Sequence, residues 1–343
     1  MIKNYHKILL ISETHIKPKK LYVDQVPKLA KGLIRLGHDV SHLSYTGIMA
    51  QLSPFKSRTI NHRFYKNKTD ATICEYAKHF RPDIVFIGFS RGLDKQTVQA
   101  LRATLPTAIF FGWDGDPSPT NNPGRIELAC ELDILFATNN GEFLDEYKKQ
   151  GIKKCLFMPN LIDPDNDHRY DVGKPWQSDI LWTGKIQHQV GIDAGETVRQ
   201  NVLSKFSGQS GVKIYGCLGY SEIGGIDYLY AISGARIGIS INAINTVPFY
   251  HSDRFTHYSA CGAMVLAKRV PETDCLMEDN KHVRYFDTEE ECRELADWYL
   301  KHEKERQAIA DAGNKHCHAN YNSVQMAGHI INAIESGDRK SVV

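Results

Sequence analysis

Short, continuously apolar segments alternate with helix-like segments along nearly the whole chain, and this alternation limits the possible folds more than any other feature. In the first half the predicted strands are residues 7–12, 40–43, 84–87, 108–111, 134–137 and 156–158. Apolar residues at helical spacing predict helices at residues 23–36, 71–80, 97–105 and 142–150. Continuous apolar strands separated by helices indicate a parallel sheet that is covered on both faces.

The alternation stops at residues 159–177, which are rich in Pro, Asp and Asn, and then restarts. The predicted strands of the second half are residues 179–182, 212–215, 236–241 and 263–266, and the predicted helices are residues 196–206, 228–232, 254–260, 289–302, 304–319 and 324–335. We therefore predict an α/β protein with two doubly wound, Rossmann-like parallel-sheet domains. A chain of 343 residues agrees with two domains of about 150 residues each.

The expected boundaries follow from the same pattern. Residues 1–160 form the N-terminal domain, residues 161–177 a linker, and residues 178–322 the C-terminal domain. Residues 323–343 add a helix and a tail, which we expect to return to the N-terminal domain. Ligands of doubly wound folds bind at the carboxyl ends of the strands, so we expect the site in the cleft between the two domains.

Composition excludes several classes of function. The net charge of +2 gives no reason to expect a nucleic-acid partner. No apolar run approaches the ~20 residues of a membrane-spanning helix, and the eight cysteines contain no C-x-x-C pair that would suggest a disulfide scaffold or zinc. We expect a cytoplasmic protein.

Two basic stretches leave contact with an anionic partner open. They contain Lys17, Lys19 and Lys20, and Lys56, Arg58, Arg63, Lys66 and Lys68. Such stretches are most often solvated faces. They also suit a phosphate-bearing acceptor or peripheral contact with the inner face of an anionic membrane.

Two glycine turns follow predicted strands of the C-terminal domain. Gly184 precedes Lys185, and a glycine there lets the backbone approach a phosphate while the lysine adds a positive charge. Tyr215 precedes Gly216, and the tyrosine ring suits a base or a sugar. Either pair is also explained by an ordinary strand-to-loop turn.

The segment from His251 to Ala263 is a more specific signal. Ser252 or Asp253 would cap a helix whose N-terminus carries a partial positive charge. Arg254 in its first turn could pair with a pyrophosphate, and His257 lies one turn further on the same face. Gly262, among other small residues, would allow a close passage from helix to strand, and we expect it to take part in donor binding together with Asp253, Arg254 and His257.

Ionisable residues that follow strands of the N-terminal domain are candidates for catalytic residues that act on an acceptor. Asp114 and Asp116 follow the strand 108–111, where a general base would be placed. Glu13 and His15 follow the first strand, at the same predicted edge. An Asp-capped turn is the alternative explanation of the first pair. Although Asp-Gly-Asp resembles a metal-binding D-x-D, two wound units do not suit that class, and we expect no metal.

The block from Ser178 to Tyr321 resembles the donor-binding domain of group 1 glycosyltransferases with the GT-B fold, and is most similar to the branch of the CgeB-type spore maturation proteins. The resemblance rests on residues 178–185, 212–216, 233–242, Arg254 with 260–263, and Arg306 with 309–313. It implies two Rossmann-like domains that face each other across a cleft. The N-terminal domain resembles the family only in residues 37–40 and 114–117.

The resemblance also implies roles for particular residues. Gly184 and Lys185 would border the donor phosphates, and Tyr215 and Gly216 would line the nucleoside pocket. Asn242 would lie at a strand end facing the cleft, and Arg254 would meet the pyrophosphate. The family usually has a glutamate for the ribose hydroxyls three residues after this arginine. Here that residue is His257, and a neutral imidazole accepts only one such bond.

We therefore predict a metal-independent enzyme that transfers a sugar from a nucleotide-sugar donor to a glycan, lipid-linked or protein acceptor, for example in polysaccharide biosynthesis. Retention of the anomeric configuration is implied by the resemblance alone. Two alternatives stay open: a nucleotide-sugar epimerase on the same fold, and a non-catalytic sugar- or nucleotide-binding relative in envelope or spore assembly. The donor base, the sugar, the acceptor and the oligomeric state are not predicted.

Overall fold

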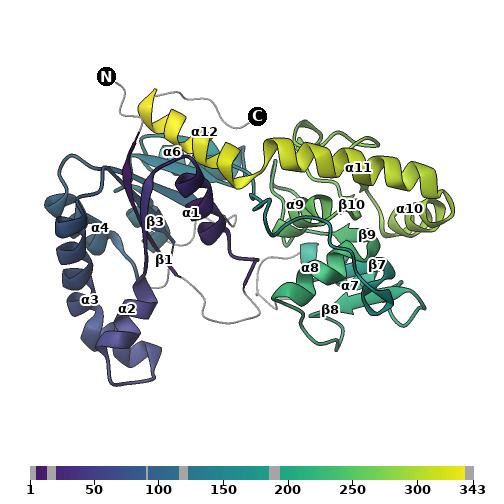
Figure 1. The fold of residues 1–343 in the computed structure, drawn as a ribbon, viewed down its shortest axis with the longest axis horizontal. Helices are drawn as coiled ribbons and strands as arrows, with labels where there is room; N and C mark the ends of the chain where they lie inside the picture. The colour runs from purple at the N-terminus through teal and green to yellow at the C-terminus, as the bar shows by residue number, and fades with distance from the viewer. Residues whose placement is uncertain (1–4, 14–20, 90–91, 116–122, 185–193, 337–343) are drawn as a thin grey trace. The chain divides into compact units, whose positions relative to one another are not determined.

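The structure is a computed structural model, and it describes residues 5–13, 21–89, 92–115, 123–184 and 194–336. The chain divides into two compact units (Figure 1). The first unit consists of Val26–Met158 with segments from both ends of the chain, and the second consists mainly of Pro159–Gln325. Each unit contains one parallel sheet with helices, as the alternation of the sequence predicts.

The sheet of the first unit has the strand order β2-β1-β3-β4-β5-β6. Its strands are β1 (Lys7–Ser12), β2 (Asp39–Ser44), β3 (Ile84–Gly88), β4 (Ile109–Asp114), β5 (Ile134–Ala137) and β6 (Cys155–Phe157). All neighbouring pairs are parallel. Because the chain adds β2 on one side of β1 and β3 on the other, the order reverses between β1 and β3, and crevices form at such points.

Helices cover both faces of the first sheet. One face packs against α2 (Tyr45–Leu52), α3 (Arg58–Phe80), α4 (Lys95–Thr104), α5 (Pro123–Ala129) and α6 (Glu142–Lys149). On the other face, Phe86, Phe111 and Phe136 form a row of ring contacts across β3, β4 and β5. The row ends at His329 in α12 (Ser323–Glu335), whose ring centroid lies 6.1 Å from that of Phe136. The last helix therefore packs on the sheet of the first unit.

The sheet of the second unit has the order β11-β10-β9-β7-β8. Its strands are β7 (Ser178–Thr183), β8 (Val212–Tyr215), β9 (Ala235–Ser240), β10 (Met264–Lys268) and β11 (Arg284–Phe286). The helices are α7 (Ala194–Ser204), α8 (Ile226–Ser233), α9 (Asp253–Ala260), α10 (Glu289–Lys301) and α11 (Glu303–Asn320). Here the strand order reverses between β7 and β9.

The predicted elements agree with the structure within a few residues, with four exceptions. The sequence prediction has no counterpart of α2, α5 or β11, and it begins α3 at residue 71 instead of Arg58. These are short elements or polar ones. The first turns of α3 carry few apolar residues, so no helical stripe is visible there.

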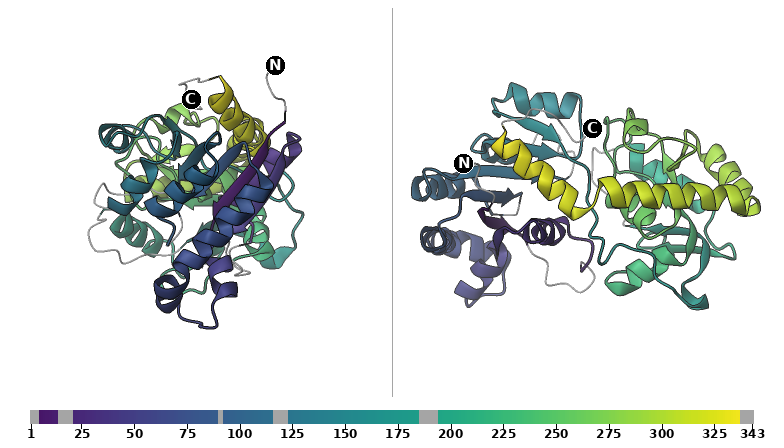
Figure 2. Two further views of the ribbon diagram at one scale, coloured as in Figure 1. Left: turned by 90° about the vertical axis from the view of Figure 1, so that its left-hand side faces the viewer. Right: turned by 45° about the horizontal axis from the view of Figure 1, so that its top comes forward.

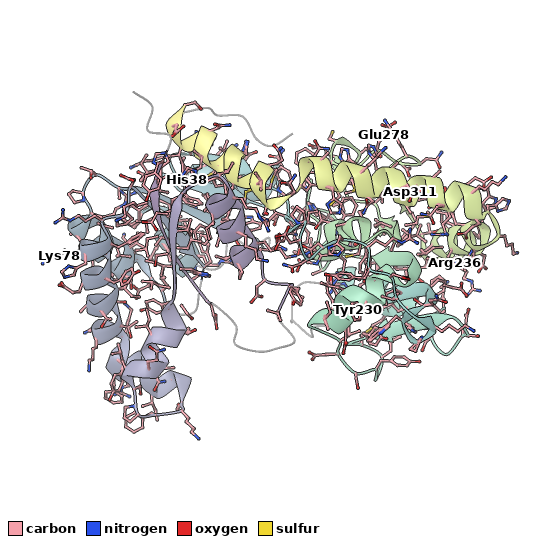
Figure 3. The ribbon with its side chains drawn as sticks, viewed as in Figure 1. His38, Lys78, Tyr230, Arg236, Glu278 and Asp311 are labelled. Atoms are coloured by element: carbon pink, nitrogen blue, oxygen red, sulfur yellow. The ribbon has the colours of Figure 1, made fainter. Side chains whose placement is uncertain are left out.

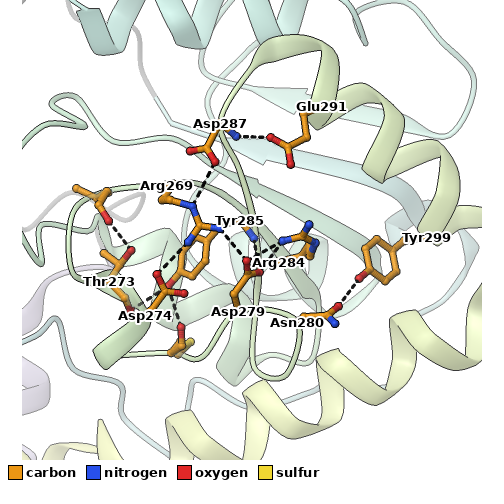
Figure 4. Close-up of polar contacts among 12 residues, drawn as sticks. Arg269, Thr273, Asp274, Asp279, Asn280, Arg284, Tyr285, Asp287, Glu291 and Tyr299 are labelled. Carbon is orange, nitrogen blue, oxygen red and sulfur yellow. Dashed lines mark hydrogen bonds and ion pairs between the residues drawn. The ribbon is translucent and has the colours of Figure 1, made fainter.

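An ionic cluster holds the segment between β10 and β11 (Figure 4). Asp279 accepts hydrogen bonds from Arg269 at 2.7 Å and from Arg284 at 2.7 Å and 2.8 Å. It also accepts one from the backbone N–H of Tyr285 at 3.1 Å. No helix in the described parts of the chain is long and apolar enough to cross a membrane.

Candidate functional site

The residues predicted for donor binding lie mostly at the carboxyl edge of the second sheet, where the strand order reverses. Gly184 follows β7, Gly216 follows β8 and Asn242 follows β9. Since β9 and β8 both flank β7, the three strand ends are neighbours in space. The backbone N–H of Gly184 donates to the carbonyl of Tyr215 at 3.1 Å, which joins the first two turns.

Gly184 makes room for the side chain of Arg254. Its φ is +139°, and a Cβ atom at this position would lie 2.6 Å from Arg254 Nη1. Real Cβ atoms do not approach so closely, so any other residue would displace the guanidinium. Gly216 is constrained in the same way, because its φ is +86° and a Cβ would lie 2.8 Å from the Gly184 carbonyl oxygen.

Arg254, in the first turn of α9, bridges the point where the strand order reverses. Its Nη1 donates to the carbonyl of Thr183 at 3.3 Å and its Nη2 to that of Ile241 at 2.9 Å. The guanidinium also lies over the Trp182 ring, 4.5 Å from the ring centroid. A guanidinium has five N–H donors, so most of them are left for other groups.

The residues around the N-terminus of α9 contain buried polar atoms that have no hydrogen-bond partner among the residues that the structure describes. They are Nε2 of His251, Oγ of Ser252 and Nε of Arg254. Ser252 is the N-cap residue, but its side chain makes no capping bond. Instead, its N–H donates to Oδ1 of Asn242 at 2.8 Å, and the Asn242 amide donates to the Tyr250 carbonyl at 3.0 Å. Asn242 therefore positions this helix N-terminus against the end of β9.

His251 is neutral near pH 7, because burial lowers its pKa to about 4. Its Nδ1 lies 2.9 Å from the carbonyl of Phe249. A carbonyl only accepts, so Nδ1 carries the proton and Nε2 presents a lone pair. Beside the donors of Arg254 and Ser252, the site therefore contains one buried acceptor.

His257 and Asp253 are also on α9, in different surroundings. His257 is completely buried, and its Nδ1 lies 3.0 Å from the hydroxyl of Tyr228. Its ring therefore belongs to the interior of the second unit. Asp253 is half-buried in the first turn of α9. Its negative charge interacts favourably with the helix dipole there but would repel a phosphate. Tyr258 joins α9 to β7, since its hydroxyl accepts from the Thr183 N–H at 2.9 Å.

Lys185 lies outside the described residues. Tyr215 is half-buried at the end of β8, and burial raises the pKa of its phenol. The structure thus brings together Gly184, Tyr215, Gly216, Asn242 and Arg254 around the start of α9.

Gly262 does not lie with them, because it follows α9 at the opposite end of the helix. It lines a cavity of about 860 Å³ at the amino edge of the second sheet, with Ser178 and Ala235 at the starts of β7 and β9. A Cβ at Gly262 would meet the side chain of Arg169 at 3.0 Å. The sequence prediction for Gly262 therefore has no geometric support, and a packing role explains this glycine.

The charges of this cavity largely satisfy one another. Arg236, labelled in Figure 3, pairs with Asp179 at 2.9 Å and with Glu303 at 2.6 Å. Arg306 pairs with Glu303 at 2.5 Å and donates to the Arg236 carbonyl at 2.9 Å. These pairs tie α11 to the starts of β7 and β9.

In the first unit, Asp114 is fully buried at the end of β4. Its carboxylate accepts hydrogen bonds from Arg125 Nη2 and from the Tyr147 hydroxyl. Burial and the carboxylate of Asp114 both raise the pKa of Tyr147. A carboxylate without exposed surface that is held by two donors is poorly suited to deprotonating an acceptor. This geometry favours a positioning role for Asp114 over the expected role as a base.

The structure says less about the other three candidates for acting on the acceptor. Asp116 and His15 lie outside the described residues. Glu13 is half-buried and follows β1, two strands away from β4, which corresponds to about 10 Å between strand backbones. Among the residues that the structure describes, no cluster of three or more His, Cys, Asp or Glu side chains is arranged to hold a metal ion.

Sequence reasoning missed two residues of the site. Arg199 in α7 is buried, and its Nε donates to the Ile241 carbonyl at 3.0 Å, the same oxygen that Arg254 contacts. Trp182, read only as a strand residue, is the ring beneath Arg254. The sequence did contain a signal for Trp182, because this tryptophan stands near a predicted strand end, two residues before a glycine. It contained no comparable signal for Arg199.

The model of the family described as "Glycosyl transferase-like" matches residues 199–332, which is less than half of the chain. This match includes β8, β9 and α9, but it begins after β7 and Gly184. No curated protein sequence matches the chain.

Several solved structures share the fold over nearly the whole length. A glycosyltransferase from Rickettsia africae has a TM-score of 0.65 at 14% identity, and the match covers 97% of this chain and 99% of that one. HepE from Anabaena, in complex with UDP and glucose, has a TM-score of 0.60 at 12% identity, covering 96% and 100%. A protein from Listeria monocytogenes described as a putative UDP-N-acetylglucosamine 2-epimerase has a TM-score of 0.56 at 13% identity, covering 98% and 99%. The chain therefore has the α/β fold with two parallel sheets that is called GT-B.

Proposed function

We propose that the chain is a glycosyltransferase that moves a sugar from a nucleotide-sugar donor to a glycan, lipid-linked or protein acceptor. One observation carries the proposal. At the N-terminus of α9, Arg254 is fixed over Trp182 with N–H donors that no described residue uses, beside Oγ of Ser252 and Nε2 of His251, which have no partner among the described residues. A helix N-terminus with a fixed guanidinium suits a diphosphate.

In this proposal the protein itself stabilises the charge of the leaving nucleoside diphosphate. Arg254 and the N–H groups of α9 would bind the phosphate oxygens, which gain charge as the glycosidic bond breaks. The glycine turns at Gly184 and Gly216 would let the backbone approach the donor, and Tyr215 would pack against the nucleoside. We propose that no metal is needed, and that the anomeric configuration is retained.

The acceptor would be activated from the first unit. Since Asp114 is buried and held by Arg125 and Tyr147, we assign it to positioning the end of β4. Glu13 and Asp116 remain the carboxylates proposed to act on the acceptor hydroxyl.

The comparisons support the donor class. HepE is described in complex with UDP and with UDP-glucose, and the matched family is glycosyltransferase-like. We propose UDP-sugars as the first donors to test. Membership of the CgeB-type branch and a role in polysaccharide biosynthesis are part of the proposal.

An epimerase is the second candidate, because the Listeria protein described as an epimerase matches over the same length. An epimerase converts the sugar of the donor without releasing a nucleoside diphosphate. A third candidate, a binding protein without activity, is suggested by His257 in place of the glutamate of the resembled family.

The deciding experiment measures both binding and turnover. A panel of nucleotide sugars is screened for a rise in melting temperature, and the donors that bind are incubated with and without candidate acceptors. Release of nucleoside diphosphate that increases with an acceptor would support the transferase. Conversion of the donor without release would support the epimerase, and binding without either would support the binding protein. If no nucleotide or nucleotide sugar raises the melting temperature, the proposed donor site is wrong.

A further inference from the structure

The end of α2 and the start of α3 present an unusual group of exposed apolar side chains. We call residues 53–68 the α2–α3 tip. Phe55 is 49% exposed, Ile60 38% and Phe64 65%. Side chains of this size are normally buried, and several of them close together mark a surface that contacts something else. Within the first unit, this tip extends past the ends of the strands in two views (Figures 1 and 2).

The packing of α3 explains why these side chains cannot turn inward. The buried positions of this helix are Asn61, Thr69, Ile73 and Ala77, and they define the face toward the sheet. Ile60 and Phe64 are four residues apart and therefore share another face. Phe55 is fixed by an edge contact with Tyr65, with 6.4 Å between the ring centroids.

The α2–α3 tip contains basic residues but no acidic ones. Between Val40 and Thr69 the sequence contains no Asp or Glu, while its lysines and arginines are Lys56, Arg58, Arg63, Lys66 and Lys68. Lys66 is engaged, because its Nζ lies 2.6 Å from Asp70 and 3.0 Å from Asp94. Lys56, Arg63 and Lys68 are exposed and form no ion pair within the described parts of the chain. The Arg63 guanidinium lies 5.6 Å from the centroid of the Phe64 ring, so charge and apolar surface are adjacent.

We propose that the α2–α3 tip binds the surface of an anionic lipid bilayer. Phe64 and Ile60 enter the boundary between headgroups and acyl chains, and Lys56, Arg63 and Lys68 contact the lipid phosphates. Aromatic and aliphatic residues flanked by cations are the composition of interfacial membrane anchors. An acidic protein surface would use the cations but would leave the exposed phenylalanines in water, so the combination favours a lipid surface.

The test is sedimentation of the full-length chain with lipid vesicles. One set contains phosphatidylcholine alone, and the other contains roughly a third phosphatidylglycerol, which supplies the negative surface potential. We expect the chain to sediment with the anionic vesicles only, and added salt to release it because surface charges are screened. Binding does not depend on the proposed enzymatic activity, so either idea can fail alone.

Matched variants locate the contact. Replacing Arg63 and Phe64 together by serine should weaken binding at least about tenfold, since each cation near such a surface contributes roughly fivefold and the ring adds apolar contact. The control is Trp298→Ser with Lys301→Ser, which removes an exposed aromatic ring and an exposed cation from α10. Melting temperatures verify that both variants fold.

Three results would overturn the proposal: no sedimentation with anionic vesicles, equal sedimentation with both kinds of vesicle, or equal losses in the two double variants. Retention of the chain on polyglutamate beads without binding to anionic vesicles would replace the lipid surface by an acidic protein partner.

Discussion

Gly184 and Arg254 fit together in a way that only glycine allows. A Cβ atom at position 184 would lie 2.6 Å from Arg254 Nη1, the nitrogen that donates to the Thr183 carbonyl. The glycine thus keeps the guanidinium over Trp182, where no described residue uses its remaining donors. The geometry of the proposed phosphate site therefore depends on a residue without a side chain.

Replacing Gly184 by alanine should displace Arg254 and weaken binding of nucleotide sugars by at least about tenfold, because a charged hydrogen bond contributes roughly 1.5–3 kcal/mol. Affinity is measured by titration calorimetry. Gly208→Ala is the control, since Gly208 also has a positive φ of +76° but nothing lies within 4 Å of the added Cβ. Equal affinity in the Gly184 and Gly208 variants would show that the close contact is unimportant.

Asp114→Asn should reduce the free energy of unfolding of the chain. Asp114 is fully buried, whereas the side chain of its partner Arg125 is 27% exposed, so we expect a loss of about 1–3 kcal/mol from the disrupted hydrogen bonds. The measurement is chemical denaturation. Asp145→Asn is the control because the exposed pair of Asp145 with Lys148, at 3.0 Å, contributes at most about 1 kcal/mol. A stable but inactive Asp114 variant would restore this residue as the base.

The parts of the fold that could be predicted are those with a strong local signal. The strands 134–137 and 212–215 have the predicted bounds, because each is a short apolar or alternating run between helices. The helix α2, in contrast, has only eight residues and contains Gly47, although its buried residues Tyr45 and Met49 share one face. The first turns of α3 lie at the surface, with Ile60 and Phe64 exposed, so no buried apolar stripe marks them and their helical state depends on packing of the later turns.

The same distinction between local and long-range signals applies to the residues of the site. Gly184, Gly216 and Arg254 stand beside strand ends or a helix start in the sequence, so local rules were sufficient to select them. The contact of Arg199 with the Ile241 carbonyl requires that β9 lies beside β7, and this order is a long-range property. The burial of His257 likewise depends on α8, which supplies Tyr228.

His251 should make the stability of the protein depend on pH. Its pKa is lowered to about 4 by burial, against about 6.5 in the unfolded chain. Between these values the unfolded chain binds more protons, so stability rises with pH. This contribution is complete above pH 6.5, and about 3 kcal/mol of it is lost as pH falls to about 4.

The measurement is the free energy of unfolding of the native chain and of His251→Asn at several pH values. Asparagine keeps a donor for the Phe249 carbonyl but does not titrate, and all other groups contribute equally to both proteins. The difference between the two curves should therefore change across this window. Parallel curves would show that His251 does not titrate as a buried neutral base.

Asp279 should stabilise the second unit without affecting nucleotide binding. Burial acts to raise the pKa of its carboxyl, but hydrogen bonds from Arg284, the Tyr285 N–H and Arg269 outweigh it, and the pKa is lowered. The contribution is present above the unfolded pKa, near 3.9, and is lost as pH falls through the folded value. Asp279→Ala should cost about 1.5–3 kcal/mol in denaturation at neutral pH.

Asp274→Ala is the control for this cluster, because Asp274 contacts Arg269 at 2.9 Å and is half exposed. It should cost less than about 1 kcal/mol. The same loss in both variants would mean that the contacts of Asp279 with Arg284 and Tyr285 contribute nothing.

Arg254, at the N-terminus of α9, is proposed to bind the diphosphate of a nucleotide. Titration calorimetry of a panel of nucleoside diphosphates with the native chain and with Arg254→Met tests it most directly, and melting temperatures verify that the variant folds. The account predicts saturable binding of at least one nucleoside diphosphate, weakened at least about tenfold in the variant. Equal affinity of the native and variant chains, or no binding of any member of the panel, would contradict it.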